Sequence, residues 1–376
     1  MNELTIKEVS TKKDFHRFLQ FPYDLFKDDK MWVPPLIIDE KTTFDKKKKN
    51  PALEFCECKI FMAYRGEKAV GRIVGIINEK SNSIWKEKRV RFGWFDFVDD
   101  NAVCKILLDA VAEWGKSKGM EEIVGPMGFT DMDKEGMIVE GFDVDCPMAC
   151  YYNPSYYPKH MDMLSYRKEV DWVQYQIPAN QAVPDKVHRI NEMIKEKYDL
   201  RILQGLSKKQ LAKRYGLKLF NTLNEAFADL FGYVPLNDKQ KEFYINQYFP
   251  FLDKRLICLV VDKNDDVVAF GISMPSLSNA LRKCKGRLFP FGWIHLLKAL
   301  KTFENIDLYL NGVKPEWQNK GIHSIYYAEM NKQYIKLGSK MAIADPQLET
   351  NQAANIWKKY DSRIAIRRRA YIKTIE

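Results

Sequence analysis

Residues 306–324 read IDLYLNGVKPEWQNKGIHS. This segment predicts a strand that ends in a turn at Pro315, followed by a loop with Gly321 that opens a long helix. Consecutive backbone N–H groups at a helix N-terminus, with no side chain at the glycine, can enclose a pyrophosphate. We therefore expect the main-chain amides of residues 318–324 to bind a diphosphate, with Lys320 adding positive charge beside it.

The order of elements around this segment occurs twice in the chain. Each half predicts a strand, a helix, a β-hairpin, a second helix that ends at glycine, and another strand. Gly71 and Gly271 occupy corresponding places in the two hairpins, and Gly119 and Gly338 end the corresponding helices. The second pair of glycines lies further apart than the first, which predicts an insertion into the second half over 275–302.

We interpret the chain as a divergent tandem duplication rather than as two unrelated domains. Each unit predicts an α+β fold with a mixed α/β sheet, because its strands and helices do not alternate as in a regular βαβ repeat. The predicted units are 1–177 and 199–376, joined by a linker helix over 178–198. In the first unit the place of the glycine loop is taken by 97–103, which has no glycine and carries two aspartates. We expect only the second unit to bind phosphate.

The glycine loop resembles the pyrophosphate-binding motif of the GNAT superfamily, the acyl-CoA N-acyltransferases, which reads V-x-P-x-x-[Q/R]-x-x-G-x-[G/A]. Val313, Pro315, Gln318 and Gly321 match this motif in order and spacing, and His323 stands where the family has its last Gly or Ala. The resemblance implies two tandem GNAT-like domains, the first degenerate, with acetyl-CoA or a longer acyl-CoA as co-substrate. The residues that it places at the CoA site are Val313, Gln318, Asn319, Lys320, Gly321, Ile322, His323, Ser324 and Asn351.

The catalytic acid of the family is expected further along the chain. Asn351 starts the N-x-x-A signature that GNAT proteins carry there, but Lys358 replaces the tyrosine that in the family protonates the departing CoA thiolate. Tyr360 follows shortly afterwards and is the candidate acid, with Asp345 and Glu349 as local alternatives for orientation or base work. The strand before the glycine loop would present a backbone N–H to the thioester carbonyl.

The whole chain also resembles a bacterial family of tandem GNAT proteins, through the segments 125–130, 135–143 and 152–157. Relatives in that family have been connected with the acylation of long-chain amines, including bacterial ceramide formation. The resemblance implies an acyltransferase that moves an acyl group from a CoA thioester to an amine acceptor, with long-chain or lipid amines among the candidates. A non-catalytic GNAT-like module that binds CoA or lipid stays open as an alternative, because the tyrosine is displaced and His323 departs from the motif.

Residues 125–157 form a long segment that is rich in Gly, Met, acids and tyrosine. A loop of this length in a compact domain is usually functional or disordered, and this one is too aromatic for disorder. We expect it to build the acceptor pocket between the two halves. The candidates to bind the ammonium or to act as general base are Asp131, Asp133, Glu135, Glu140 and Asp143. Turnover is expected to depend on Glu140 and Asp143, and surface solvation is the alternative for each acid alone.

The predicted insertion contains residues 282–301, a basic flank followed by Phe, Trp and Leu residues. This composition is typical of a segment that binds at a membrane surface, where basic side chains attract anionic headgroups and aromatic rings are buried at the acyl boundary. A peripheral contact with an anionic membrane, or a tunnel for an acyl chain, would suit a lipid substrate. A cap helix packed on the core is the alternative.

The end of the chain carries basic side chains on predicted strands, namely Arg363, Arg367, Arg368, Arg369 and Lys373. Alternation places Arg367 and Arg369 on one face and Arg368 on the other. We expect ordinary exposed charge on an edge strand, and neutralisation of CoA phosphates is the alternative.

The composition bounds the remaining possibilities. The 376 residues carry a formal net charge of +10 and are 46% hydrophobic, which excludes disorder for the bulk of the chain. No apolar run approaches the ~18–20 residues of a transmembrane helix, and the N-terminus lacks an apolar export segment. We therefore expect a cytoplasmic protein, peripheral at the inner membrane if 282–301 binds lipid. The sparse cysteines argue for reduced thiols and against a metal site, and no base-reading motif suggests nucleic acid.

Overall fold

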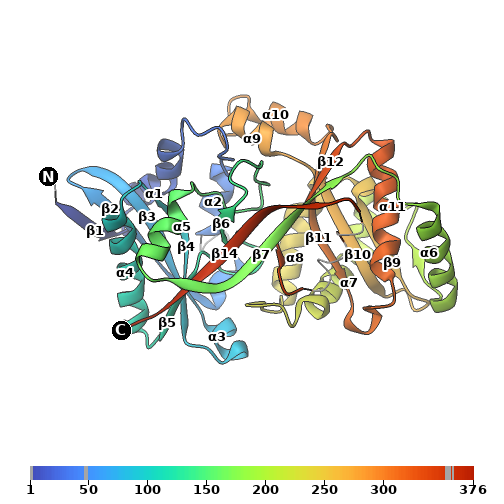
Figure 1. The fold of residues 1–376 in the computed structure, drawn as a ribbon, viewed down its shortest axis with the longest axis horizontal. Helices are drawn as coiled ribbons and strands as arrows, with labels where there is room; N and C mark the ends of the chain where they lie inside the picture. Colours follow the sequence, from blue (N-terminus) through green and yellow to red (C-terminus); the bar gives the residue numbers. More distant parts are fainter. Residues whose placement is uncertain (1–2, 46–49, 352–356, 358–359) are drawn as a thin grey trace.

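The computed structural model describes residues 3–45, 50–351, 357 and 360–376 (Figure 1). Their strands form one mixed sheet that runs through two similar halves, with helices against its faces. The elements of the first half are β1 (Leu4–Glu8), α1 (Lys12–Leu25), α2 (Ile37–Thr43), β2 (Cys56–Arg65), β3 (Lys68–Asn78), α3 (Glu79–Trp85), β4 (Arg89–Phe97), α4 (Asn101–Ser117), β5 (Glu122–Gly125), β6 (Met137–Glu140), α5 (Tyr156–Met163) and β7 (Arg167–Pro178). Those of the second half are α6 (Asp185–Tyr198), β8 (Arg201–Ile202), α7 (Lys208–Phe227), α8 (Asp238–Tyr248), β9 (Ile257–Val261), β10 (Val267–Pro275), α9 (Ser278–Cys284), α10 (Gly292–Ala299), β11 (Asn305–Val313), α11 (Ile322–Lys336), β12 (Met341–Ala344), β13 (Gln347–Leu348) and β14 (Arg363–Thr374).

The two halves repeat one order of elements, which confirms the predicted α+β fold with a mixed sheet. The antiparallel hairpin β2–β3 corresponds to β9–β10. In each half the next strand then pairs in parallel with the strand that follows the long helix, β4 with β5 and β11 with β12. A parallel pair needs a crossover connection, and α4 and α11 supply it.

Two glycines allow the long helix of each half to lie close to its sheet. A Cβ atom at Gly71 in β3 would come within 2.6 Å of Leu107 in α4, and one at Gly271 in β10 would come within 2.5 Å of Met330 in α11. Real Cβ atoms do not approach other atoms so closely, so a larger residue at either site would require the facing side chain of the helix to shift. The two positions are therefore equivalent in structure, as their places in the sequence predict.

The two halves exchange their last strands. The strand order is β1-β2-β3-β4-β5-β14-β7-β12-β11-β10-β9-β8. Strand β14, from the end of the chain, lies between β5 and β7, and β7 in turn pairs with β12 of the second half. The central pair has Arg368 opposite Trp172. In Figure 1 both strands cross the molecule from one half to the other.

Helices α9 and α10 stand between β10 and β11, where the first half has α3 alone. This is where the sequence predicts an insertion. Both helices are short, and no helix among the described residues combines the length and the apolar character that crossing a bilayer requires.

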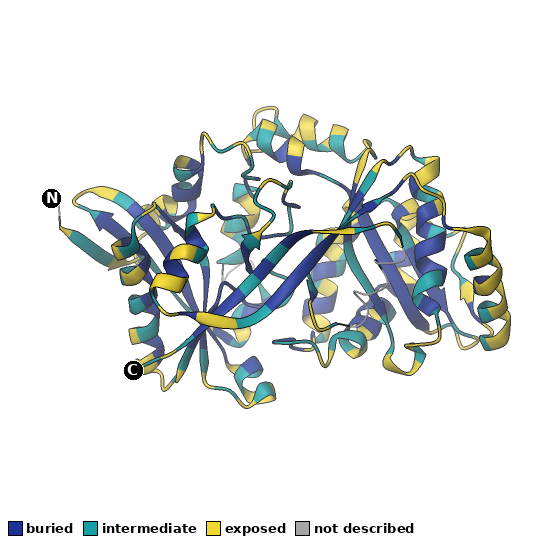
Figure 2. Cartoon of the chain, in the orientation of Figure 1, coloured by how far each residue is buried: buried dark blue, intermediate teal, exposed yellow. Residues whose placement is uncertain are grey.

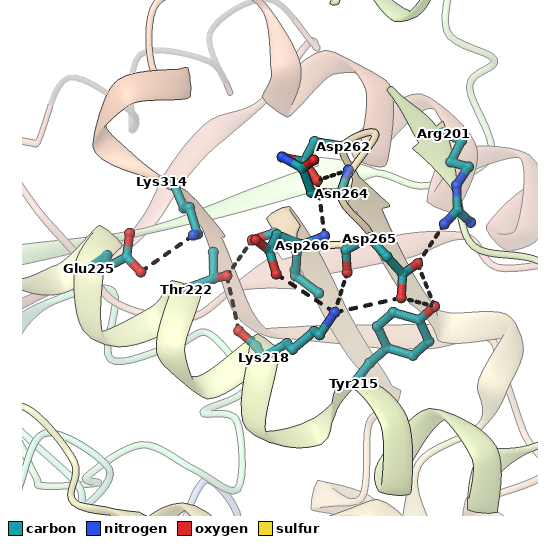
Figure 3. Close-up of polar contacts among 11 residues, drawn as sticks. Arg201, Tyr215, Lys218, Thr222, Glu225, Asp262, Asn264, Asp265, Asp266 and Lys314 are labelled. Carbon is teal, nitrogen blue, oxygen red and sulfur yellow. Dashed lines mark hydrogen bonds and ion pairs between the residues drawn. The ribbon is translucent and has the colours of Figure 1, made fainter. Parts of the chain in front are cut away.

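Helix α7 supports the outer hairpin of the second half (Figure 3). Tyr215 donates a hydrogen bond of 2.8 Å to Asp265 Oδ1, and Lys218 Nζ donates one of 2.6 Å to the main-chain oxygen of Asp265. From the same helix, Glu225 forms an ion pair of 3.4 Å with Lys314, the first residue after β11. Helix α7 therefore holds the point at which β11 leads into the glycine loop.

Candidate active site

The sheet opens between β11 and β12. These strands pair only over 305–308 and 341–344. Asp345 N then donates a hydrogen bond of 3.0 Å to Leu308 O. Beyond this point β11 continues to Val313, while the chain after β12 turns into β13. The edge of β11 that follows Leu308 therefore faces an opening in the sheet.

One backbone N–H of β11 is directed into this opening. Lys314 N donates a hydrogen bond of 2.9 Å to Val268 O in β10, on the other edge of the strand. Because successive backbone groups of a strand alternate between its two edges, the N–H of Asn311 points away from β10. The Asn311 side chain is held by Tyr326 of α11, whose hydroxyl donates a hydrogen bond of 3.2 Å to Asn311 Oδ1.

The glycine loop leads from β11 to α11. Asn319 and Gly321 have φ angles of 59° and 80°, both in the left-handed region, and Gln318 Nε2 bridges the loop by donating a hydrogen bond of 3.2 Å to Val313 O. A Cβ at Gly321 would lie 2.9 Å from Ile194. Helix α11 begins after Gly321 with no side-chain cap from a described residue. The first N–H groups of a helix have no partner within the helix and can serve an anion.

A cavity of 1240 Å³ lies at this opening. Of the residues expected at the CoA site, those in its wall are Val313, Gln318, Asn319, Ile322, His323 and Asn351. Lys320 Nζ instead lies over the rings of Trp317 and Tyr198, 5.0 and 5.4 Å from their centroids. Gly321 and Ser324 are not part of the cavity wall, and Ser324 N donates a hydrogen bond of 3.0 Å to Gly321 O. The N-x-x-A signature continues over 352–354, outside the described residues, as does Lys358.

The opposite wall of the same cavity comes from the first half. It contains parts of the long segment 125–157, including residues 131–135 and 148–152. Burial raises the pKa of Asp131 and of Asp133 to about 6, and burial together with the charge of Asp131 raises the pKa of Glu135 well above its ordinary value. The fold therefore brings a carboxyl group cluster of one half opposite the glycine loop of the other.

A second acidic group lies where the two walls meet, at the start of the opening. Asp345 lines the cavity, and burial together with the neighbouring Asp307 raises its pKa well above the ordinary range. Tyr309 lies beside them as the extra residue of a β-bulge, since the register between β10 and β11 shifts there. Burial also raises the pKa of the Tyr309 hydroxyl. Tyr309 and Asp307 were not identified from the sequence, although a carboxylate inside an apolar strand is an unusual signal.

Several polar atoms of the cavity wall have no hydrogen-bond partner within the described residues. They are Glu135 Oε1, Gln247 Oε1, Tyr309 Oη and Asp345 Oδ1. Buried polar atoms are almost always hydrogen-bonded in native proteins, so unsatisfied ones in a cavity indicate a polar ligand. No group of three or more His, Cys, Asp or Glu residues in the described part of the chain is arranged to hold a metal ion.

Behind the cavity, Arg368 occupies the seam between the halves. The expectation of exposed edge-strand charge is wrong for this residue, which is 0% exposed, because β14 is a central strand. Its guanidinium donates hydrogen bonds of 2.6 Å to Gln174 Oε1 and 3.1 Å to Cys146 Sγ. A hydrogen bond from Cys150 and the charge of Arg368 lower the pKa of the Cys146 thiol to about 6. This buried positive charge also faces Asp345.

The remaining predicted catalytic residues lie outside the cavity wall. Glu140 and Asp143 are exposed, and Glu140 forms an ion pair of 3.4 Å with Arg367. Glu349 is paired with the same arginine at 2.9 Å. Tyr360 packs on Tyr327, with 4.4 Å between ring centroids. Asp345 is thus the predicted catalytic residue that the structure brings to the cavity, and catalytic roles for the others stay predictions.

The strand order, the open edge of β11 and the glycine loop together define a GNAT fold in tandem. Two solved structures agree with this over their whole length: the tandem GNAT protein from the clavulanic acid biosynthesis pathway, with a TM-score of 0.55 and 9% identity, covers 100% of this chain and 99% of its own. A GCN5-related N-acetyltransferase from Sphaerobacter thermophilus, with a TM-score of 0.54 and 10% identity, covers 99% and 96%. The chain therefore has the fold of a tandem GNAT protein.

Two curated proteins are similar to the chain in sequence. The bacterial ceramide synthase of Caulobacter vibrioides is 27% identical over 328 residues, which cover 84% of this chain and 82% of that protein. Protein YghO of Escherichia coli is 26% identical over 320 residues, covering 83% and 79%. No protein-family profile matches the chain.

Proposed function

We propose that the chain is an acyl-CoA-dependent N-acyltransferase that transfers the acyl group of a CoA thioester to a long-chain or lipid amine. One observation carries this proposal: a single cavity joins the glycine loop and open strand edge of the second half to the half-buried carboxyl groups of the first. An acyl donor and an amine acceptor need to meet in this way. The volume of 1240 Å³ exceeds the ~300–1,000 Å³ typical of pockets for one small ligand, which suits two co-substrates.

The acyl donor is placed by backbone groups. With the diphosphate of CoA at the start of α11, its pantetheine arm would follow the open edge of β11 between the halves of the split sheet. The N–H of Asn311 then faces the thioester carbonyl, polarises it and stabilises the oxyanion that develops during attack. Because this backbone N–H is fixed in a strand, it can stabilise the oxyanion without any reorganisation of the protein.

In this proposal, a carboxylate removes the proton that the acceptor amine loses. An amine must lose a proton before it attacks the carbonyl carbon, and a carboxylate with a raised pKa is a suitable acceptor near neutral pH. Asp345 is our choice for this base, because it lies in the opening beside β11 with an unpaired Oδ1. The attack forms the C–N bond, the C–S bond then breaks, the nitrogen gives up its second proton to solvent as the neutral amide forms, and the CoA thiolate takes up a proton. Tyr309, whose hydroxyl is unpaired beside Asp345, is a candidate donor alongside Tyr360.

Two observations support a long-chain or lipid amine as the acceptor: the apolar part of the cavity wall and the similarity to one curated protein. The side of the cavity formed by the insertion is lined by Leu288, Leu296 and Leu300, which offer no partner to a polar acceptor but suit an alkyl chain. The similarity to a protein named bacterial ceramide synthase supports a lipid amine as the acceptor.

Release of free CoA thiol tests the proposal. The chain is incubated with acetyl- to palmitoyl-CoA and with amines of increasing chain length, and mass spectrometry identifies the amide. We expect turnover that increases with the chain length of the amine. Asp345→Asn should lower kcat by about 10²–10⁴-fold, the usual contribution of a general base, without weakening acyl-CoA binding measured by calorimetry.

Asp185→Asn, an exposed position in α6, is the matched control and should leave turnover unchanged. Acyl-CoA binding without thiol release for any amine would refute the proposed activity and favour the non-catalytic CoA-binding module. Equal turnover of the wild type and Asp345→Asn would reject Asp345 as the base.

A further inference from the structure

Helix α10 and the loop before it carry exposed apolar side chains, and Figure 2 shows this helix without a buried residue. Its side chains are Phe289, Phe291, Trp293, Ile294 and Leu297, with exposed fractions of 81%, 69%, 45%, 46% and 52%, and we call them the α10 face. No residue of α10 is buried. The helix packs on the core only through its inner side, so the expectation of a cap helix does not account for the aromatic and aliphatic groups outside. Large apolar side chains exposed together within one short segment indicate an interaction surface.

Positive charge surrounds the α10 face. Lys283 and Lys285 precede it in the sequence, and Lys298 and Lys301 follow it; all are exposed. None of their ammonium groups forms an ion pair with a described residue, and residues 282–301 contain no Asp or Glu. Unpaired lysines around exposed aromatic rings provide the two attractions that hold a protein on an anionic bilayer.

The α10 face continues into the cavity. Trp293 and Leu297 belong both to the exposed face and to the cavity wall. The inner side of the same helix adds Leu296 and Leu300 to that wall. A hydrocarbon chain that leaves a bilayer at the α10 face would therefore meet apolar side chains of α10 that also line the cavity.

The insertion is fixed in place by the first half. Arg282 of α9 donates a hydrogen bond of 3.0 Å to Met31 O and pairs with Asp145 at 2.7 Å. Ile37 N donates a hydrogen bond of 3.0 Å to Gly286 O in the loop that leads to α10. These bonds hold α10 across the junction of the two halves, so its apolar side chains face outward on a supported platform.

We propose that the α10 face docks on an anionic lipid bilayer and that lipid substrate passes beneath α10 into the cavity. The docking is inferred from the exposed side chains of the α10 face alone. The passage of substrate rests on the proposed acyltransferase function. The rings of Phe289 and Phe291 insert at the acyl boundary, and the four lysines contact anionic headgroups.

A second copy of the chain is a poorer occupant of this surface. A symmetric dimer places the same surface on both sides of the interface. Contact through the α10 face would bring the lysines of one copy against those of the other, with no acid in the segment to pair them. Anionic headgroups neutralise the same charges.

Co-sedimentation with vesicles tests the docking. We expect the chain to bind vesicles of phosphatidylcholine with about 30% phosphatidylglycerol at least tenfold more tightly than vesicles of phosphatidylcholine alone, because each lysine near an anionic surface adds to binding. A triple variant, F289S/F291S/I294S, removes exposed groups outside the cavity wall and should abolish binding. Lys298→Ala with Lys301→Ala should weaken binding about tenfold or more, and raised salt should do the same.

Two matched controls separate docking from general surface effects. The triple variant I84S/M163S/M193S removes equally exposed side chains elsewhere, and Lys186→Ala with Lys213→Ala removes two exposed lysines on other helices. Both should bind vesicles as the wild type does. Absence of wild-type binding to anionic vesicles overturns the proposal. So does a triple variant F289S/F291S/I294S that retains vesicle binding and instead converts a dimer to a monomer in sedimentation velocity.

The two proposals fail in different ways. Vesicle binding without thiol release for any amine would refute the acyltransferase function and leave the docking intact. Turnover of a short, water-soluble amine by the wild type, without vesicle binding, would refute only the docking. F289S/F291S/I294S should retain that short-amine turnover and lose at least tenfold on a long-chain amine presented in anionic vesicles.

Discussion

Asp307 places a carboxyl group inside β11 at 1% exposure, and burial raises its pKa from 3.8 to about 7. The folded chain therefore holds this proton more tightly than the unfolded chain does. The resulting stability is complete below about pH 4 and is lost as the pH rises to about 7. We expect Asp307→Asn to leave the free energy of unfolding unchanged at pH 4 and to raise it at pH 8, by at most about 4 kcal/mol. Urea denaturation at the two pH values measures this.

The control for this prediction is Glu67→Gln in the turn between β2 and β3, whose exposed carboxyl group should give the same small effect at both pH values. A change for Asp307→Asn that is equal at pH 4 and pH 8 would contradict the argument, because only ionisation distinguishes the two conditions. It would assign the effect to the hydrogen bond between Asp307 and Ser276 instead.

The turn and glycine loop before α11 could be predicted from the sequence because their backbone conformation depends on local order. Val313, Gln318 and Gly321 lie within one short connection, and the backbone there follows from neighbouring residues. Tyr309 could not be found in this way, since its position depends on a bulge against β10. Arg368 was misjudged for a related reason: whether a strand is an edge or a centre depends on partners distant in the sequence.

The contact between the long helix and the sheet gives a prediction with an internal control. Gly271→Val should push α11 away from β10, because its Cβ alone would lie 2.5 Å from Met330, and should cost about 1–3 kcal/mol of stability. Helix α11 also carries the glycine loop at its N-terminus, so acyl-CoA affinity should fall as well. Thermal unfolding and calorimetric titration with acyl-CoA check the two effects.

Gly71→Val is the matched variant in the first half, where a Cβ would lie 2.6 Å from Leu107 in α4. It should cost similar stability but leave acyl-CoA affinity unchanged, because the loop before α4 carries Asp99 and Asp100 and no glycine. Equal loss of affinity in the two variants would mean that the first half also contributes to CoA binding or that the damage spreads through the whole sheet.

The order of elements in each half was predictable, and the pairing between the halves was not. Hairpins, long helices and the insertion each leave a local pattern of periodicity and glycine. The exchange of β7 and β14 leaves none, since either strand could pair with its own half using the same alternating residues. The exchange places β7 beside the cavity, because Trp172 of that strand lines the cavity wall and lies opposite Arg368 of β14.

The exchanged strands join the halves into one molecule, and a divided chain tests this. If the chain is cut within 179–184 and both pieces are produced together, a tag on the first piece should retain the second at equal amounts. Strand β14 of the second piece pairs with β5 and β7 of the first over the length of the seam, and Arg368 is fully buried there. Arg368→Leu leaves Gln174 and Cys146 without their partner, so it should weaken this association, whereas Arg189→Leu at an exposed position of α6 should not. Separate elution of the two wild-type pieces would show that each half closes its own sheet, with β7 returning to β5, and that the seam does not hold the molecule together.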